Sequence, residues 1–212
     1  MIVLSKRVFL TLIMCMFFIN GFSQEHMTFQ GIPIDGNIKT FTKQMKKHGF
    51  KLVHRNNEVY SFKGRYISDG DNIMVYFSPK TTTVTMVWVS INFPLMSKTE
   101  SWEYVKQQYD YVNNLVSRNY NTAEKEATEY FEPPYVEGDG NEISAILNKK
   151  IHYNTNYYLP QGRILVTITN VSEFIFSYNL SQRDHYIPNI SIAIGDKRNE
   201  DLYKKETGDI QL

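Results

Sequence analysis

Cysteine is almost missing from this chain, which has one Cys among 212 residues. That count excludes a disulfide-stapled scaffold and a zinc site built from several cysteines. The 23 Lys and Arg residues nearly balance the 22 Asp and Glu residues, so no net basic charge favours binding to nucleic acid. Charged residues at 21% and hydrophobic residues at 42% exclude both a disordered chain and a polytopic membrane protein.

Sequence motifs of common catalytic sites are missing as well. No serine stands in a Gly-x-Ser-x-Gly elbow, and neither a His-Glu-x-x-His pair nor a Gly-x-x-x-x-Gly-Lys phosphate loop occurs. The acidic turn Gly138–Glu142 does not fit a calcium-binding EF-hand loop, because Ile143 and Ser144 occupy positions that need an acidic or amide side chain and a glycine. We therefore predict no catalytic residue, no metal site and no cofactor, and we favour a protein that is not an enzyme.

The first 23 residues are typical of a secretory signal peptide. Two basic residues, Lys6 and Arg7, precede an apolar run over residues 8–19. The run is shorter than the roughly 20 residues that a transmembrane helix needs. Small residues at Gly21 and Ser23 predict cleavage before Gln24 or one residue later. The alternative is a short N-terminal membrane anchor.

The only cysteine, Cys15, lies inside this apolar run rather than behind it, so it does not fit a lipid-attachment signal. Cleavage leaves a mature chain without cysteine, which suits an oxidising compartment. We expect export to the periplasm or the extracellular space, with no stable membrane span after the signal is removed and no nucleic-acid partner.

The mature chain predicts one α+β domain over residues 24–194, with possible halves 24–96 and 97–194, followed by a polar, loosely packed tail over 195–212. In the first half, Asn37 can cap a helix over about 38–48, which Gly49 ends. Strands are expected at 50–54, 58–66, 73–78 and 84–91, where β-branched and aromatic residues alternate with turn residues.

The second half begins with a predicted helix. Ser97–Glu100 fits a capping box, and the apolar stripe Trp102, Val105, Tyr109, Val112 and Val116 follows at helical spacing. Residues 119–132 predict either a strand or a frayed helix, and a short helix is possible at about 142–149. Further strands are expected at 150–158, 163–169, 173–178 and 187–194. The fold class is thus α+β, with two helix-plus-antiparallel-meander units packed as one compact domain.

The run Phe29-x-Gly-Ile-Pro-Ile-Asp-Gly36 resembles the start of a family of uncharacterised secreted proteins from gut-type anaerobic bacteria. Later landmarks of that family match Trp102, Tyr109 and the segments 130–135 and 162–168, so the resemblance covers most of residues 29–180. It implies export and assigns no catalytic residue. One departure is Asn119-Tyr-Asn121, where the family tends to have Lys-Tyr-Gly. The duplicated helix-then-meander order is also similar to the fold of the beta-lactamase inhibitor protein.

Two groups of side chains are candidates for a functional site. Glu126, Glu129 and Glu132 could imitate a glycosidase carboxylate pair on a helix, but a solvated strand edge is the better interpretation. The 15 tyrosines are the other enriched feature, and those of the second half gather around Tyr135, Tyr153 and Tyr157. Tyrosine suits a binding surface as well as an ordinary half-buried sheet.

We therefore expect a non-enzymatic binding or inhibitor-like module of the cell envelope, with Tyr135, Tyr153 and Tyr157 as its ligand-binding residues. The partner would be an envelope protein or a glycan. The alternatives are a glycan-directed hydrolase and an envelope assembly or structural factor.

Overall fold

The computed structural model of the protein describes residues 26–91, 102–170 and 188–207. The predicted signal peptide, the capping box at Ser97–Glu100 and the predicted strand 173–178 lie outside these residues. The predictions made for those segments therefore stay predictions.

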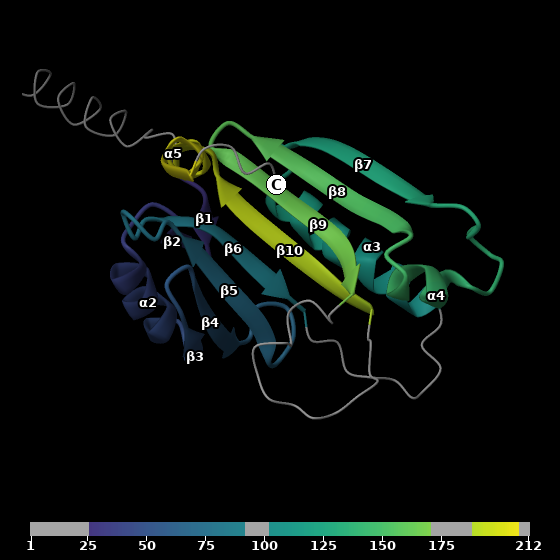
Figure 1. The fold of residues 1–212 in the computed structure, drawn as a ribbon, viewed down its shortest axis with the longest axis horizontal. Helices are drawn as coiled ribbons and strands as arrows, with labels where there is room; N and C mark the ends of the chain where they lie inside the picture. The colour runs from purple at the N-terminus through teal and green to yellow at the C-terminus, as the bar shows by residue number, and fades with distance from the viewer. Residues whose placement is uncertain (1–25, 92–101, 171–187, 208–212) are drawn as a thin grey trace, which may run out of the picture.

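One antiparallel sheet of eight strands organises the molecule (Figure 1), with the strand order β3-β4-β5-β6-β10-β9-β8-β7. The strands are β3 (Lys51–Arg55), β4 (Val59–Gly64), β5 (Asp71–Phe77), β6 (Val84–Ser90), β7 (Glu124–Phe131), β8 (Ile151–Leu159), β9 (Gly162–Asn170) and β10 (Pro188–Asp196). With its helices, this sheet confirms an α+β fold. Residues 119–132, for which strand and helix were both open, contain strand β7.

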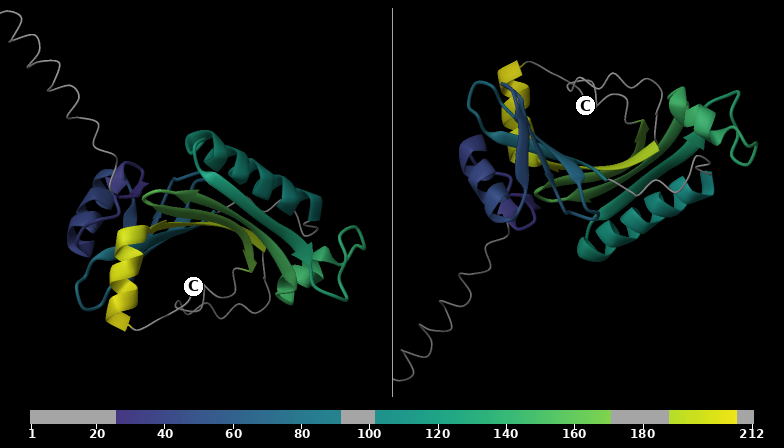
Figure 2. Two further views of the ribbon diagram at one scale, coloured as in Figure 1. Left: turned by 90° about the horizontal axis from the view of Figure 1, so that it is seen from above. Right: turned by 90° about the horizontal axis from the view of Figure 1, so that it is seen from below.

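The helices α2 (Ile38–Lys47) and α3 (Trp102–Asn119) lie on one side of the sheet (Figure 2). Helix α2 begins as predicted, because the Asn37 side chain accepts a hydrogen bond from the Lys39 amide at 2.8 Å. It ends at Gly49, whose φ of 88° is a left-handed conformation that glycine adopts without strain. The predicted stripe of α3 is confirmed, since all five of its members are buried.

A small hairpin leads into α2. Strand β1 (Thr28–Phe29) pairs with β2 (Ile32–Pro33) across Gln30 and Gly31, which both have positive φ. Two positive φ values in a two-residue loop fit the tight twist of a hairpin turn. The hairpin places Phe29 and Ile34 in the core, where both are fully buried.

The predicted loose tail is wrong for the residues that the structure describes. Gly195 and Asp196 complete β10, and residues 197–207 form the helix α5 (Lys197–Thr207). Helix α5 and the short helix α4 (Glu142–Leu147) lie on the side of the sheet opposite α3, at opposite ends of it (Figure 2). The sequence did not predict α5 because the segment has low hydrophobicity and shows no apolar stripe. Polar rather than apolar contacts hold its first turn.

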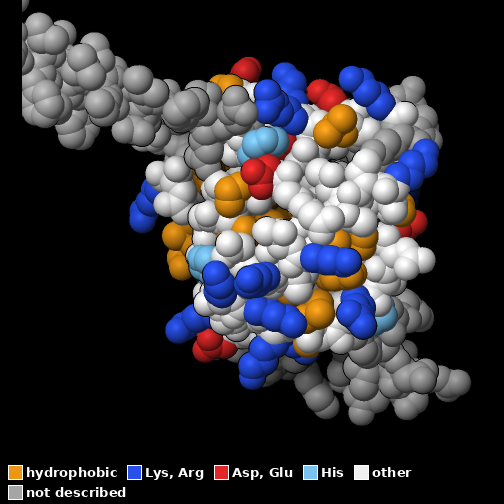
Figure 3. All heavy atoms as spheres, turned by 90° about the vertical axis from the view of Figure 1, so that its left-hand side faces the viewer, with side chains coloured by type: hydrophobic (Ala, Val, Ile, Leu, Met, Phe, Trp, Pro, Cys, Tyr) orange, Lys and Arg blue, Asp and Glu red, His pale blue; other side chains and the backbone are white. Residues whose placement is uncertain are grey.

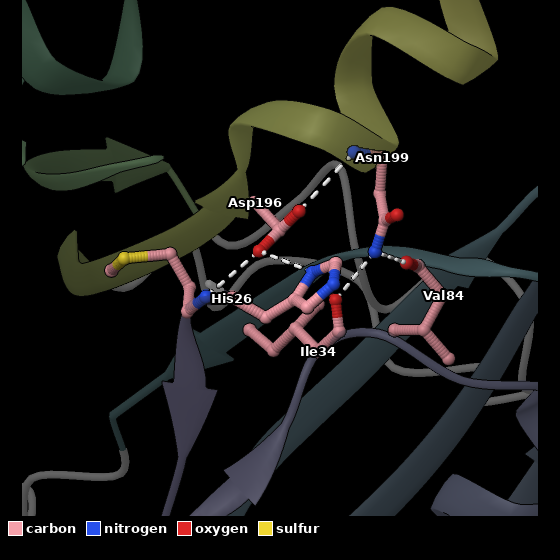
Figure 4. Close-up of polar contacts among 6 residues, drawn as sticks. His26, Ile34, Val84, Asp196 and Asn199 are labelled. Atoms are coloured by element: carbon pink, nitrogen blue, oxygen red, sulfur yellow. Dashed lines mark hydrogen bonds and ion pairs between the residues drawn. The ribbon is translucent and has the colours of Figure 1, made fainter. Parts of the chain in front are cut away.

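Those contacts form a buried network between both ends of the described chain (Figure 4). Asp196 is fully buried and caps α5 by accepting a hydrogen bond from the Asn199 amide at 3.2 Å. Its other oxygen accepts from the Met27 amide at 2.7 Å and lies 3.1 Å from His26 Nδ1. The Asn199 side chain donates to the carbonyl oxygens of Ile34 and Val84. The network thus ties α5 to the N-terminal hairpin and to β6.

Candidate functional site

The two faces of the eight-stranded sheet carry different side chains, and this difference locates the candidate site. Residues alternate between the faces along each strand, and the strand pairing aligns them in rows across the sheet. One face packs against α2 and α3 and holds the apolar core. The opposite face curves around α4 and α5 at its ends (Figure 2), and we call it the concave face. Among the described residues, no helix lies over its centre.

The central row of the concave face is apolar in the middle and charged at one end. It runs across six strands in register, from β5 to β7, through Met74, Trp88, Ala193, Leu165, Asn156 and Glu126. Met74, Trp88 and Leu165 are each only partly buried. Met74, Trp88 and Leu165 therefore form a half-buried apolar row on the face over whose centre no helix of the described residues lies.

A polar row runs beside it, through Lys63, Asn72, Ser90, Ser191, Thr167, Asn154 and Thr128. Three of its members form side-chain hydrogen bonds. The Thr167 hydroxyl donates to Asn154 Oδ1 at 2.5 Å, and the hydroxyls of Thr169 and Ser191 are 3.0 Å apart. Ser90, Ser191 and Thr167 are buried. The accessible polar groups of this row are therefore those towards its ends, on Lys63, Asn72, Asn154 and Thr128.

A third row adds aromatic rings to the two sides of the face. It contains Tyr76, Met86, Gly195, Arg163 and Tyr158. The Tyr76 hydroxyl points to the Met74 thioether, with the oxygen 3.8 Å from the sulfur. Burial raises the pKa of Tyr76, so this hydroxyl stays protonated and keeps its donor at physiological pH. Tyr158 is 40% exposed, and its hydroxyl donates to Glu126 at 3.1 Å.

Two of the three predicted ligand-binding tyrosines lie on the other face. Tyr153 and Tyr157 are each 2% exposed beneath α3, so neither ring presents a surface to a ligand. The expectation that they form an exposed pair is therefore corrected. The period of a strand does put them on one face, as expected, but that face is the one that packs against the helix.

The contacts of these two rings explain why tyrosine occupies core positions. The Tyr157 hydroxyl donates to the backbone oxygen and to Oδ1 of Asn113, both at 3.0 Å. The Tyr153 hydroxyl donates to Glu137 Oε2 at 3.0 Å, and the indole N–H of Trp102 donates to the other oxygen of the same carboxylate at 3.1 Å. Burial raises the pKa of Tyr157 to about 12 and that of Tyr153 as well, where the Glu137 hydrogen bond adds to the effect.

Tyr135, the third predicted residue, lies in the loop between β7 and α4 and is partly buried. Its hydroxyl accepts a hydrogen bond from the Asn148 side chain at 2.8 Å. The structure thus does not bring the three tyrosines together on one surface. Sequence reasoning did not single out Met74, Trp88 and Leu165. Each stands between two β-branched apolar residues, so no polar-apolar alternation marks the face on which it lies.

The acidic candidates are also separated. On β7, Glu129 pairs with Tyr153 and faces α3, whereas Glu126 pairs with Asn156 and faces the concave side. Glu132 follows the strand and accepts from Lys150 Nζ at 2.6 Å, and its other oxygen is 2.6 Å from His152 Nε2. The hydrogen bond from Lys150, with that from His152, holds the pKa of Glu132 below its usual range. Glu126 and Glu129 thus face opposite sides of the sheet, and Glu132 is bound by Lys150 and His152.

Comparisons with known proteins return nothing for this chain: no family model, no curated protein and no solved structure matches it. The described residues contain no group of three or more His, Cys, Asp or Glu side chains able to hold a metal ion. In the same residues, no helix combines the length and the apolar character needed to cross a membrane.

Proposed function

We propose that this protein is a secreted, non-enzymatic binding module that holds a protein partner on its concave face. One observation carries the proposal: Met74, Trp88 and Leu165 form a half-buried apolar row on a face whose centre no described helix covers. A sheet face with this composition in an ordinary domain would pack against a helix, as the opposite face does here.

The mixture of side chains favours a protein over a glycan as the partner. Flexible Met and rigid aromatic side chains supply contact area, and the accessible side chains of Asn72, Asn154 and Thr128 supply hydrogen bonds. The charge of the face also changes from Lys63 at one end to Glu124 and Glu126 at the other, which selects a partner with the opposite order of charges. The alternative of a glycan hydrolase lacks support, because Glu126 and Glu129 point to opposite faces.

We further infer two units of similar build within the domain, one made of α2 with β3–β6 and one of α3 with β7–β10. The symmetric strand order, in which β6 and β10 meet at the centre, supports this inference. Such an arrangement lets a partner contact both units at once along the rows.

Site-specific photocrosslinking in living cells tests the proposed face. A photoreactive side chain is placed at exposed Asn72 on the concave face, and at exposed Tyr111 on α3 in a matched control. We expect a discrete crosslinked protein from position 72 and none from position 111. In the background of the first variant, Trp88→Ala should reduce the crosslink at least about tenfold, as hot-spot aromatic residues do.

A second variant distinguishes the loss of a partner contact from a folding defect caused by Trp88→Ala. Asn156→Arg adds bulk and charge to the centre of the face at a partly buried position, without removing a core side chain. It should abolish the crosslink while the melting temperature stays near that of the native protein. An undiminished crosslink in both variants, or an equal crosslink from position 111, contradicts the proposal.

A further inference from the structure

The strongest charged surface of the molecule lies at the end formed by α2 and the β3 edge, where it adjoins the concave face at Lys63. Between residues 36 and 66 there are eight Lys and Arg residues and a single acidic residue, Glu58. All eight basic side chains are exposed, and Arg65 forms an ion pair with Asp69 at 3.2 Å. We call the other seven the basic end: Lys39, Lys43, Lys46, Lys47, Lys51, Arg55 and Lys63. Figure 3 shows Lys and Arg side chains gathered on this side, with few acidic ones among them.

The basic end is not neutralised within the molecule. In the described part of the chain, none of its seven side chains takes part in an ion pair. Helix α2 contributes four lysines on the outside, while Ile38, Phe41 and Met45 bury its inner side. Like charges placed this closely repel one another, so the arrangement costs free energy unless an anionic partner compensates it.

The opposite end of the sheet has the opposite charge. Residues 120–148 contain seven Asp and Glu residues and one basic residue, Lys125. Strand β7 lies at the far edge from β3, about 30 Å away when neighbouring strands are roughly 4.8 Å apart. The charge that is balanced over the whole chain is therefore separated in space, and a negatively charged surface would orient the molecule with α2 towards it.

We propose that the basic end binds the anionic headgroups of a lipid bilayer. Lysines on flexible stems act as point charges, which suits the diffuse negative charge of a bilayer surface. No exposed Phe, Tyr or Trp lies between residues 36 and 66, where nucleic-acid bases could stack on it, and lysine outnumbers arginine six to one in the basic end.

Vesicle sedimentation of the mature chain, which begins at Gln24 or Glu25 in the form predicted for export, tests the proposal. One set of vesicles contains equal parts of phosphatidylglycerol and phosphatidylcholine, and the other contains phosphatidylcholine alone. The neutral vesicles report any binding that does not depend on headgroup charge. We expect at least about tenfold more binding to the anionic vesicles at low salt, and no difference at about 1 M salt, where charges are screened beyond about 3 Å.

Charge-removing variants identify the surface. Lys43→Gln with Lys47→Gln should lower binding to anionic vesicles about 25-fold, since each lysine near a bilayer contributes about a fivefold change. The matched control removes two exposed positive charges from α3 and β7, with Arg118→Gln and Lys125→Gln, and should change binding less than about twofold. Both pairs should keep the native melting temperature.

Three results would overturn the proposal. The first is no preference for anionic vesicles, and the second is an equal loss of binding in the control pair. The third is displacement from the vesicles by millimolar inorganic phosphate, or by duplex DNA at equal phosphate, which would identify a small anion or a nucleic acid as the ligand. None of these results depends on the concave face, so the proposed function can be tested separately.

Discussion

The two faces of the sheet differ in how completely their rows are buried. On the face against α3, rows such as Tyr157, Ile164, Ile194 and Val87 are continuous and apolar, and every member is buried. On the concave face, the central row keeps Met74, Trp88 and Leu165 partly accessible beside hydroxyl and amide groups. The first face is thus fully packed, and the second keeps partly accessible apolar area, on which the proposed partner contact rests. The predictions below test that difference.

The largest effect is expected from Trp102→Ala. Trp102 is 6% exposed and packs edge-on against Phe131 and Tyr153, with ring centroids 5.2 and 4.9 Å away. Truncation leaves a cavity under α3 and removes a donor from Glu137, so we expect a loss of roughly 3–5 kcal/mol in the free energy of unfolding. Urea denaturation measures it. An unchanged midpoint would show that α3 contributes little to the core.

Asn199→Ala should have the next largest effect, and it tests whether α5 is part of the domain. The Asn199 side chain is 2% exposed and donates to the carbonyl oxygens of Ile34 and Val84. Removing it leaves two buried acceptors without this donor, which we expect to cost about 2–3 kcal/mol. Lys197→Ala, at an exposed position two residues earlier, is the control and should be nearly neutral. Equal, small effects of both substitutions would mean that α5 unfolds independently of the sheet.

Tyr157→Phe and Tyr158→Phe compare the two faces directly, because adjacent residues on β8 point to opposite sides. Tyr157 donates to two oxygens of Asn113 in the core, whereas Tyr158 donates to Glu126 at an exposed position. We expect a loss of about 1–2 kcal/mol for the first change and less than about 0.5 kcal/mol for the second. Thermal and urea unfolding give both values. The reverse order would mean that the assignment of faces is wrong.

The same pair of residues shows why the sequence predicts the fold better than the site. Helical spacing and the Asn37 cap were sufficient for α2 and α3, because burial of an apolar stripe is a local requirement. Alternation on a strand shows which residues share a face, but it does not show which face a helix will cover. Tyr153 and Tyr157 fit a binding surface as well as a core, since tyrosine can pack in a core and still form a hydrogen bond through its hydroxyl. Helix α5 was missed for a related reason, because the buried contacts of Asp196 and Asn199 with the N-terminal hairpin join residues far apart in the sequence.

The smallest effect is expected at the acidic edge, from Glu132→Gln. Hydrogen bonds from Lys150 and His152 lower the pKa of Glu132 in the folded protein, while the unfolded value stays near 4.5. A carboxylate with a lowered folded pKa stabilises the fold fully above its unfolded pKa and loses that contribution as pH falls through the folded value. The pKa of Lys150 is raised from 10.5 by the same partner, so its contribution is lost only when pH rises through the raised value.

The melting temperatures of native protein and Glu132→Gln should therefore differ slightly between about pH 5 and pH 10, and should converge in acid. The pair is partly exposed, and added salt should shrink the difference. Glu124→Gln, on the same edge of the sheet, is the matched control and should show no such convergence, because Glu124 has no hydrogen bond or ion pair through its side chain among the described residues. If the difference in melting temperature between native protein and Glu132→Gln persists unchanged into acid, the ion pair does not cause it. The stabilisation by Glu132 would then come from packing and not from charge.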